Sequence, residues 1–559
     1  MPDEPAKSAP ETSATKPTFR GEGLLVGSFL SYLLPRLQTD RSSPTWPPDI
    51  FGLCMALVCK AGAYCRILEN WPPVGTAGPT PDTWANWIAE RGKEWSKIWP
   101  AIPQFIADRW KIVSNAWNNP VEQIATNLPL AQALLELCAL ADEASEGFWL
   151  PGSPGTPGTQ KTTGDLKFYV RAESLRKRTG MAATLCEELH PSRLCVLPKC
   201  RTPQNGLTSR SLSHHLALCS ADEIKPQWVM GPYGNAEELS LNLLLVPWPE
   251  LVTPRQFDVT QPTPTEMRNM PQNFGFFGYQ NNDSSPQNVV RMVEDLYEAA
   301  RNKMGRVDGI VLPEAALNAE QHKLLSDAVL RRGVFLVSGV GEAAANADAH
   351  SQNFLYVDLP TIKPLIQHKH HRWMLDQPQI SQYGLGSRLY PEKSWWEHIS
   401  LSDRKLNFIA VLPWLVMSVL ICEDLARPDP VGDLVRAVGP NLVIALLMDG
   451  PQLKERWGAR YATTLADDPG SSVLTVTSGG MCSLSRPPAG VQARRVVALW
   501  KDAKSPAPVE IELPMGSQGV VVSLSVRRLE EWTADGRGDK RNAGYPMLSG
   551  IHPVSVTSK

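Results

Sequence analysis

The sequence has no apolar run long enough to cross a bilayer. The two longest runs are LLVGSFLSYLL at 24–34 and IFGLCMALVC at 50–59, and both are shorter than the ~20 residues that a membrane helix needs. The first run has Lys16 and Arg20 close upstream and no small-residue cleavage signature behind it, which argues against a secretory signal. We therefore expect a cytoplasmic protein with no membrane partner.

An excess of charge of one sign is also lacking. The chain carries 55 Lys and Arg residues against 57 Asp and Glu residues, which leaves a formal net charge of -2. No global basic field therefore attracts an anionic surface, and nucleic acid is not indicated as a partner. With 559 residues, 43% of them hydrophobic, the chain has room for two or three domains with cores of their own.

The ten cysteines lack the tight spacing of a disulfide framework, so we expect most of them to be reduced. Cys195 and Cys200 lie close together, but no second pair of ligands follows at the distance typical of a zinc finger. We interpret these two, and also Cys54, Cys59 and Cys65 in an apolar stretch, as small buried hydrophobic residues. No metal ion and no cofactor is expected.

The first part of the chain divides into a tail and a helical, tryptophan-rich region. Residues 1–18 are polar and proline-bearing, which predicts a disordered tail. From 19 to 150 the apolar residues recur at helical spacing, and nine of the 18 tryptophans fall there. One helical face is marked by Trp84, Trp87, Ile88, Trp95 and Ile98. We interpret it as internal packing, because tryptophan buries a large apolar area; a surface that docks a protein partner is the alternative.

A segment rich in Pro, Gly, Ser and Thr at 151–165 predicts a linker. Residues 166–237 form a connecting region of uncertain fold, in which we interpret His214 and His215 as structural or exposed. Residues 238–530 make up the main domain, and 531–559 a C-terminal extension.

In the main domain, short apolar runs alternate with segments whose apolar residues recur at helical spacing. This alternation is typical of α/β proteins. The runs predicted as strands are LNLLLVPW (241–248), FGFFGY (274–279), GIVL (309–312), VFLVSGV (334–340), FLYVDL (354–359), NFIAVL (407–412), VMSVLI (416–421), LVIALL (442–447), SVLTVT (472–477) and GVVVSLSV (519–526). Their number favours one large sandwich over a set of small modules.

Three polar side chains follow, or lie beside, buried strands of this domain. Glu314 lies in DGIVLPEAAL, Lys369 in QHKHHRW and Cys422 in VLICEDL. Strand ends are places where a rigid scaffold holds side chains in a fixed geometry. We therefore treat these residues as the candidate catalytic set.

The three residue types complement one another chemically. A thiol with an ordinary pKa of about 8.5 is mostly protonated at neutral pH, so Cys422 needs a base or a cation to become a nucleophile. A partly desolvated carboxylate such as Glu314 is a competent base. An ammonium such as Lys369, with the backbone N–H of Glu423, stabilises the charge of a tetrahedral intermediate. Taken singly, each residue has an ordinary structural interpretation; in this order and context the set predicts a hydrolytic triad.

The ordered set VLPE, the Lys of KHH, and ICEDL resembles the nitrilase superfamily of carbon–nitrogen hydrolases. The resemblance covers about 238–530 and implies the triad Glu314, Lys369 and Cys422. It also implies a second glutamate upstream of the nucleophile, which Glu397 in SWWEHI fits, with Glu392 as the alternative.

As for fold, the resemblance implies an α/β, nitrilase-like α-β-β-α sandwich, here preceded by a mostly helical domain. As for activity, it implies hydrolysis of a non-peptide amide or nitrile through a cysteine thioester, with no cofactor, and a homo-oligomer. A scaffold without activity, or an effector subunit in a multi-component assembly such as a bacterial antiviral system, is the alternative. The acidic Glu423 in place of an aromatic after the nucleophile, and an insertion before FGFFGY, leave the substrate open.

Overall fold

The computed structural model describes residues 23–65, 81–147, 163–176, 182–203, 206, 208–220, 223–231, 239–268, 270–281, 284–344, 349–401, 404–412, 414–487, 492–538 and 543–556. The predicted tail at 1–18 lies outside these residues, as does the predicted linker at 151–165 except for its last three positions. No helix within the described ranges combines the length and apolar character that crossing a bilayer requires.

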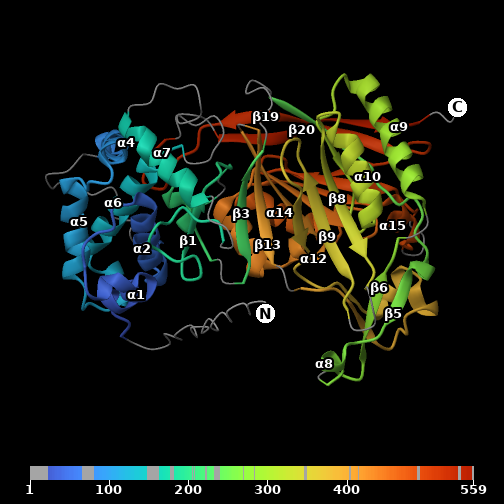
Figure 1. Ribbon diagram of the computed structural model, residues 1–559, viewed down its shortest axis with the longest axis horizontal. Coiled ribbons are helices and arrows are strands. Elements are labelled where there is room, and N and C mark those ends of the chain that lie inside the picture. Colours follow the sequence, from blue (N-terminus) through green and yellow to red (C-terminus); the bar gives the residue numbers. More distant parts are fainter. Residues whose placement is uncertain are drawn as a thin grey trace, which may run out of the picture.

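The N-terminal part is a bundle of helices that lies at one end of the molecule (Figure 1). Its helices are α1 (Val26–Leu33), α2 (Pro47–Lys60), α4 (Pro81–Ile98), α5 (Gln104–Asn115), α6 (Leu128–Ala144) and α7 (Thr163–Arg176), with 3-10 turns η1 (Pro35–Gln38) and η2 (Val121–Ala125). Helix α6 lies centrally and packs against α2, α4 and α5. The predicted aromatic stripe is internal in part, because Trp84, Ile88 and Trp95 are buried whereas Ile98 is 42% exposed.

The larger part holds two seven-stranded sheets. The first has the order β10-β9-β8-β7-β4-β19-β20. Its strands are β4 (Ser240–Leu245), β7 (Gly309–Val311), β8 (Phe335–Glu342), β9 (Gln352–Asp358), β10 (Leu365–His368), β19 (Gly519–Leu529) and β20 (Ala543–Val554). Helices α9 (Pro286–Met304) and α10 (Ala319–Leu330) cover its outer face, where Val293 and Leu325 pack with Leu244 and Val521.

The second sheet has the order β18-β17-β16-β15-β14-β13-β3. Its strands are β3 (Lys225–Met230), β13 (Lys405–Leu412), β14 (Leu415–Ile421), β15 (Leu442–Leu447), β16 (Ser472–Thr477), β17 (Val496–Lys501) and β18 (Val509–Glu512). The accompanying helices and turns are α12 (Glu423–Ala426), η6 (Pro428–Gly432), α13 (Asp433–Val438), α14 (Trp457–Asp467) and α15 (Gly479–Leu484). Strands β14, β15 and β16 are parallel and buried throughout, which explains their continuous apolar sequence.

The two sheets pack face to face. Val311 and Val337 of the first sheet share one core with Val419 and Ile444 of the second. Gln367, which is fully buried at the end of β10, donates a hydrogen bond from Nε2 to the carbonyl oxygen of Val419 at 2.7 Å. With helices outside both sheets, the layers are α-β-β-α, and the fold predicted from the sequence is confirmed.

Local sequence signals explain the helix ends. Ser285 caps α9 by accepting a hydrogen bond from the Asn288 N–H, and Gly305 ends the helix with φ +76°, a conformation that glycine adopts without strain. Asn318 and Gln321 form a reciprocal capping box at the start of α10. These ends fix where the chain enters and leaves the strands on either side.

One predicted strand lies outside the sandwich. FGFFGY forms β6 (Phe274–Tyr279), which belongs to a separate sheet of order β11-β12-β6-β5. The other elements of this region are β5 (Phe257–Thr260), β11 (Met374–Leu375), β12 (Ser394–Glu397), α8 (Pro264–Met267), α11 (Gln377–Gln382), η4 (Pro254–Gln256) and η5 (Leu385–Ser387). The sequence of a six-residue strand does not indicate which sheet the strand joins, because the sheet is decided by pairing with strands that are distant in sequence.

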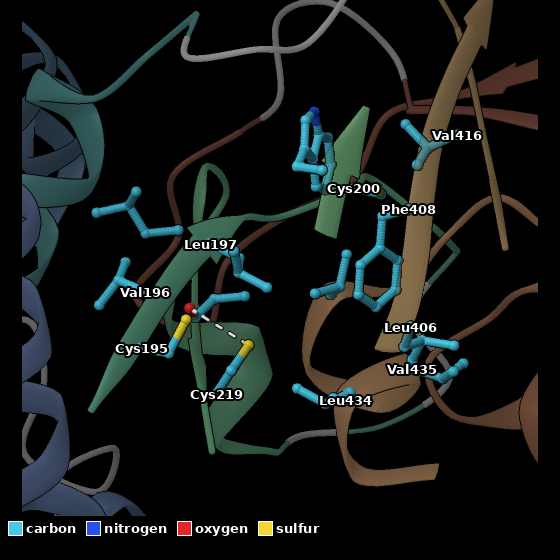
Figure 2. Packing of buried hydrophobic residues seen from close by; sticks show 14 of the residues in the cluster. Cys195, Val196, Leu197, Cys200, Cys219, Leu406, Phe408, Val416, Leu434 and Val435 are labelled. Carbon is cyan, nitrogen blue, oxygen red and sulfur yellow. Dashed lines mark hydrogen bonds between the residues drawn. The ribbon is translucent and has the colours of Figure 1, made fainter. Parts of the chain in front are cut away.

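A small hairpin connects the bundle to the sandwich. Strands β1 (Cys195–Pro198) and β2 (Leu216–Cys219), with turn η3 (Ser209–Leu212), pack on one side against α2. Figure 2 shows their other side, where side chains of the hairpin approach Phe408 and Leu434 of the second sheet and its helix. Two strands that lie outside the predicted main domain (238–530) are part of the two large sheets. Strand β3 pairs with β13, and β20 pairs with β19.

The cysteines are all reduced in the structure. Cys54, Cys195 and Cys200 are buried as expected, but Cys59 and Cys65 are exposed. The prediction for these two was wrong because the apolar run IFGLCMALVC ends at Cys59, where α2 reaches the surface. His214 and His215 are both buried, and the backbone N–H groups of both donate to Asp142.

Candidate active site

Cys422 lies at the turn between β14 and α12 and is 2% exposed. Its backbone has φ +43° and ψ -106°, a conformation that a residue with a side chain rarely adopts. The Cys422 N–H donates to the carbonyl oxygen of Leu446 on the neighbouring strand at 2.9 Å. Sheet pairing therefore holds the predicted nucleophile in a strained turn, as happens at functional sites.

Glu314 follows β7 in a second turn of this kind, in which Ala315 has φ +47°. Its side chain is fully buried. Oε1 accepts hydrogen bonds from Lys369 Nζ at 2.7 Å and from Asn353 Nδ2 at 2.8 Å, and Oε2 accepts from the Met448 N–H at 2.7 Å. Met448 directly follows β15, so Glu314 joins one sheet to the other.

Lys369 directly follows β10 and is 1% exposed. Its backbone N–H donates to the carbonyl oxygen of Asn353 on β9 at 2.9 Å, which continues the strand pairing. Its ammonium lies between two carboxylates, 2.7 Å from Glu314 Oε1 and 2.6 Å from Glu397 Oε2.

Glu397, at the end of β12, is buried in the same network, whereas Glu392 is exposed. Asn353 Nδ2 donates to Glu397 Oε1 at 2.7 Å, and the Trp373 N–H donates to Glu397 Oε2 at 3.1 Å. Two donors, Lys369 and Asn353, thus both bridge the two glutamates. The structure brings together Glu314, Lys369 and Glu397 from three separate strand ends.

Cys422 lies close enough to this network to share its electrostatics. Burial, and then the charge of Glu314, raise the pKa of the Cys422 thiol well above its usual value, and Lys369 only partly opposes them. Burial also raises the pKa of Glu314, with Glu397 adding to the effect and Lys369 opposing it. Burial would lower the pKa of Lys369, but Glu314, Glu397 and Cys422 together raise it well above its usual value. The resting site therefore holds a protonated thiol, a carboxylate of raised basicity and a firmly protonated ammonium.

The buried carboxylate of Asp424 connects the segment that follows β10 to the turn that carries Cys422. Asp424 accepts hydrogen bonds from the backbone N–H and Nδ1 of His370 at 3.1 Å each, and from Nδ1 of His371 at 2.8 Å. Desolvation of Asp424 is outweighed by these contacts, which lower its pKa to about 2. The KHH and CED motifs thus contact each other directly. Sequence reasoning assigned no role to Asp424, although its place two residues after Cys422 was a signal.

The loop after β15 is held by a second polar cluster that sequence reasoning missed. Asp449 accepts hydrogen bonds from Arg456 Nη2 at 2.6 Å and from Trp457 Nε1 at 3.0 Å, and the Tyr383 hydroxyl also donates to it. Because Asp449 adjoins Met448, this cluster fixes the N–H group that supports Glu314.

A small cavity of about 20 Å³ lies beside Glu397, between β6, β12 and the ends of β8 and β9. Its lining includes Ala315, Asn353, Glu397, His398 and Met448. A cavity of that size holds roughly one water-sized group.

Two clusters among the described residues bring His and carboxylate atoms close enough to suit a metal ion. They are Glu266, His350 and His398, and Asp142, Glu143 and His215. Each already contains an arginine, since Arg372 lies 3.1 Å from Glu266 and Arg537 lies 3.1 Å from Asp142 and 2.7 Å from Glu143. We interpret both as hydrogen-bonded structural clusters, because a guanidinium supplies the positive charge that a metal would bring.

No family model matches this sequence, and neither does any curated protein. Solved structures do resemble it. Nit3 of Saccharomyces cerevisiae, a member of branch 10 of the nitrilase superfamily, is 13% identical with a TM-score of 0.32, over 53% of this chain and 93% of that one. An amidase from Nesterenkonia sp. is 13% identical with a TM-score of 0.30, over 52% and 93%. Glutamine-dependent NAD+ synthetase from Acinetobacter baumannii is 11% identical with a TM-score of 0.31, over 51% and 46%.

Nit3 and the Nesterenkonia amidase are members of the nitrilase superfamily, which the sequence motifs of this chain resemble. The reaction has to be argued from the site.

Proposed function

We propose that this protein hydrolyses a non-peptide carbon–nitrogen bond, in an amide or a nitrile, through a thioester on Cys422. The observation that carries the proposal is one buried network of Glu314, Lys369 and Glu397 whose charges act on a cysteine in a strained turn. Acid, base and nucleophile within one water-poor site form the arrangement that covalent hydrolysis requires.

The first step is proton transfer and attack. Because the pKa of Cys422 is raised, its thiol is protonated at rest and must lose the proton as the sulfur attacks. Glu314, whose pKa is raised by burial, accepts that proton. For an amide, a carbon–sulfur bond forms and the carbonyl oxygen becomes an oxyanion.

The oxyanion is stabilised by two groups of this chain. The N–H of Glu423 lies in the first turn of α12, where backbone N–H groups have no partner within the helix. Lys369 keeps its proton because its pKa is raised well above its usual value, so its ammonium provides a permanent positive charge.

The second half of the reaction reverses the proton transfer. Glu314 gives its proton to the leaving nitrogen, the carbon–nitrogen bond breaks, and ammonia or an amine departs to leave a thioester. Glu314 then takes a proton from water, whose oxygen attacks the thioester. The carbon–sulfur bond breaks, and the thiolate regains a proton from Glu314. Atoms and charges balance without a cofactor.

The test is ammonia release over a panel of amides and nitriles by the full chain, with Cys422→Ala beside it. Cys482→Ala is the matched control, since Cys482 is also a buried thiol of the sandwich with 2% exposure. We expect release by wild type and the control but not by Cys422→Ala, and an acyl adduct on the Cys422 peptide by mass spectrometry. Identical traces for wild type and Cys422→Ala would contradict the proposal.

One observation favours the second candidate, a scaffold or effector subunit without hydrolytic activity. Cys422 is only 2% exposed, and the cavity beside the network is small. If that interpretation holds, the helical bundle provides the functional surface, and Ile98, Ile112 and Leu128, which are 38–46% exposed, are candidate contacts for a protein partner. Absence of a Cys422 adduct with every substrate of the panel would favour it. A homo-oligomer and a cytoplasmic location stay predictions.

A further inference from the structure

Asn353 has its side chain fixed by the two glutamates. The residue is 4% exposed and lies on β9. Nδ2 donates one hydrogen bond to Glu314 Oε1 at 2.8 Å and one to Glu397 Oε1 at 2.7 Å. A carboxamide has two N–H donors, so both are used. Rotating the amide by half a turn would place its carbonyl oxygen against two carboxylates, which excludes the alternative orientation.

The carbonyl oxygen of the Asn353 side chain accepts no hydrogen bond within the part of the chain that the structure describes. Among the described residues, Asn353 Oδ1 is buried and has no hydrogen-bond partner. Buried polar atoms are nearly always paired, and an exception calls for an explanation. Because the glutamates prevent the amide from turning, the oxygen cannot find a partner by reorienting.

Asn353 also lines the cavity of about 20 Å³ beside Glu397 and Met448. That volume suits one water-sized group, and an –NH₂ group has about this size. Glu314, the residue that protonates the leaving nitrogen in the proposed mechanism, is hydrogen-bonded to the same Asn353 side chain. A nitrogen in this cavity lies beside Asn353, whose side chain contacts the Glu314 carboxylate directly.

We propose that Asn353 Oδ1 accepts a hydrogen bond from the N–H of the scissile carboxamide, and that Asn353 thereby selects primary amides over esters and nitriles. The inference rests on the proposed function. An ester has oxygen at the scissile position and a nitrile nitrogen carries no hydrogen, so neither supplies the donor. A site built to pair a substrate N–H discriminates strongly against analogues that lack it, because its buried acceptor is then left unpaired.

The experiment compares a primary amide with the methyl ester of the same acyl group, measured as kcat/KM on the full chain. Asn353→Leu removes both ends of the amide, whereas Asn353→Asp loses the donors and keeps an acceptor of the same shape. We expect the amide-to-ester ratio to fall at least tenfold in Asn353→Leu and to stay within about threefold of wild type in Asn353→Asp, even where both rates fall. Asn353→Ala replaces Asn353→Leu if the latter does not fold by circular dichroism.

The ratio separates this role from mere support of the glutamates, since loss of support slows both substrates alike. An unchanged ratio in Asn353→Leu or Asn353→Ala, or a ratio that falls equally in Asn353→Asp, overturns the role of Asn353 while leaving hydrolysis by Cys422 intact. Absence of any Cys422-dependent turnover of amide and ester overturns the proposed function, and the inference with it.

Discussion

Gly339 lies so close to Glu314 that a Cβ atom at position 339 would be 2.5 Å from the Glu314 Cα and 2.3 Å from the carbonyl oxygen of Pro313. Gly339→Ala therefore forces the turn that carries Glu314, the proposed base, to move. We expect kcat/KM to fall at least ~10-fold and the free energy of unfolding to fall by about 1–3 kcal/mol, as for other overpacked sites. Gly206→Ala is the control, because no described atom lies within 4 Å of its Cβ position. Wild-type kinetics in Gly339→Ala would show that the turn tolerates displacement.

Lys369→Arg should slow turnover strongly although the charge is kept. The ammonium fits between Glu314 and Glu397 at 2.7 and 2.6 Å, and a planar fork cannot replace a compact ammonium in that space. We expect a loss of about 10²-fold or more in kcat, the size seen when a group that stabilises an oxyanion is removed. The exposed Lys454→Arg is the control. Lys369→Arg with more than a tenth of wild-type kcat would contradict the assigned role.

The acidic limb of the pH–rate profile should reflect Glu314. A base works only when ionised, so activity rises with pH through the raised pKa of Glu314. Since the charge of Glu397 helps to raise that pKa, Glu397→Gln should move the limb to lower pH. Glu392→Gln, at an exposed position, should leave it unchanged. A limb that stays in place in Glu397→Gln would mean that another group limits the rate.

Asp424 should make the free energy of unfolding depend on pH in the acidic range. Its pKa of about 2 in the folded state lies below the ordinary value of 3.8, so its ionised form stabilises the fold above pH ~4 and this stabilisation is lost as the pH falls towards 2. We expect urea midpoints of wild type and Asp424→Asn to differ at pH 6 and to converge near pH 2. A difference that is the same at both pH values would assign the effect to packing.

Arg537 should hold the helical bundle to the sandwich. Its guanidinium contacts Asp142, Glu143 and Asp535 at 3.1, 2.7 and 2.9 Å, and it is 2% exposed. Arg537→Leu removes the positive charge that these buried carboxylates face, and breaking a buried ion pair typically costs about 3–5 kcal/mol. The exposed Arg528→Leu is the control. Thermal unfolding that shifts equally in both variants would contradict this role.

The sequence predicted those features of the fold and of the candidate site that depend on neighbouring residues along the chain. Glu314 and Cys422 each follow an apolar run that was predicted as a buried strand, so their position at strand ends could be predicted. Lys369 follows β10, which was not among the predicted strands, and its place in the set came from the resemblance of the ordered motifs. Asn353 carried no such signal, since a single amide in a strand is ordinary until its partners are known. The role of Gly339 depends on a close approach of two segments, and the sheet that β6 joins depends on pairing with distant residues. Tertiary relationships of this kind leave no local pattern.

The contact between Arg537 and Asp142 spans 395 positions of the chain. At a synthesis rate of 5–20 residues per second, residue 537 follows residue 142 by roughly 20–80 s. During that interval the bundle of a growing chain lacks the guanidinium that Asp142 and Glu143 face in the finished fold. We infer that this ion pair is among the last contacts of the bundle to form, long after the helices that contain its carboxylates have been synthesised.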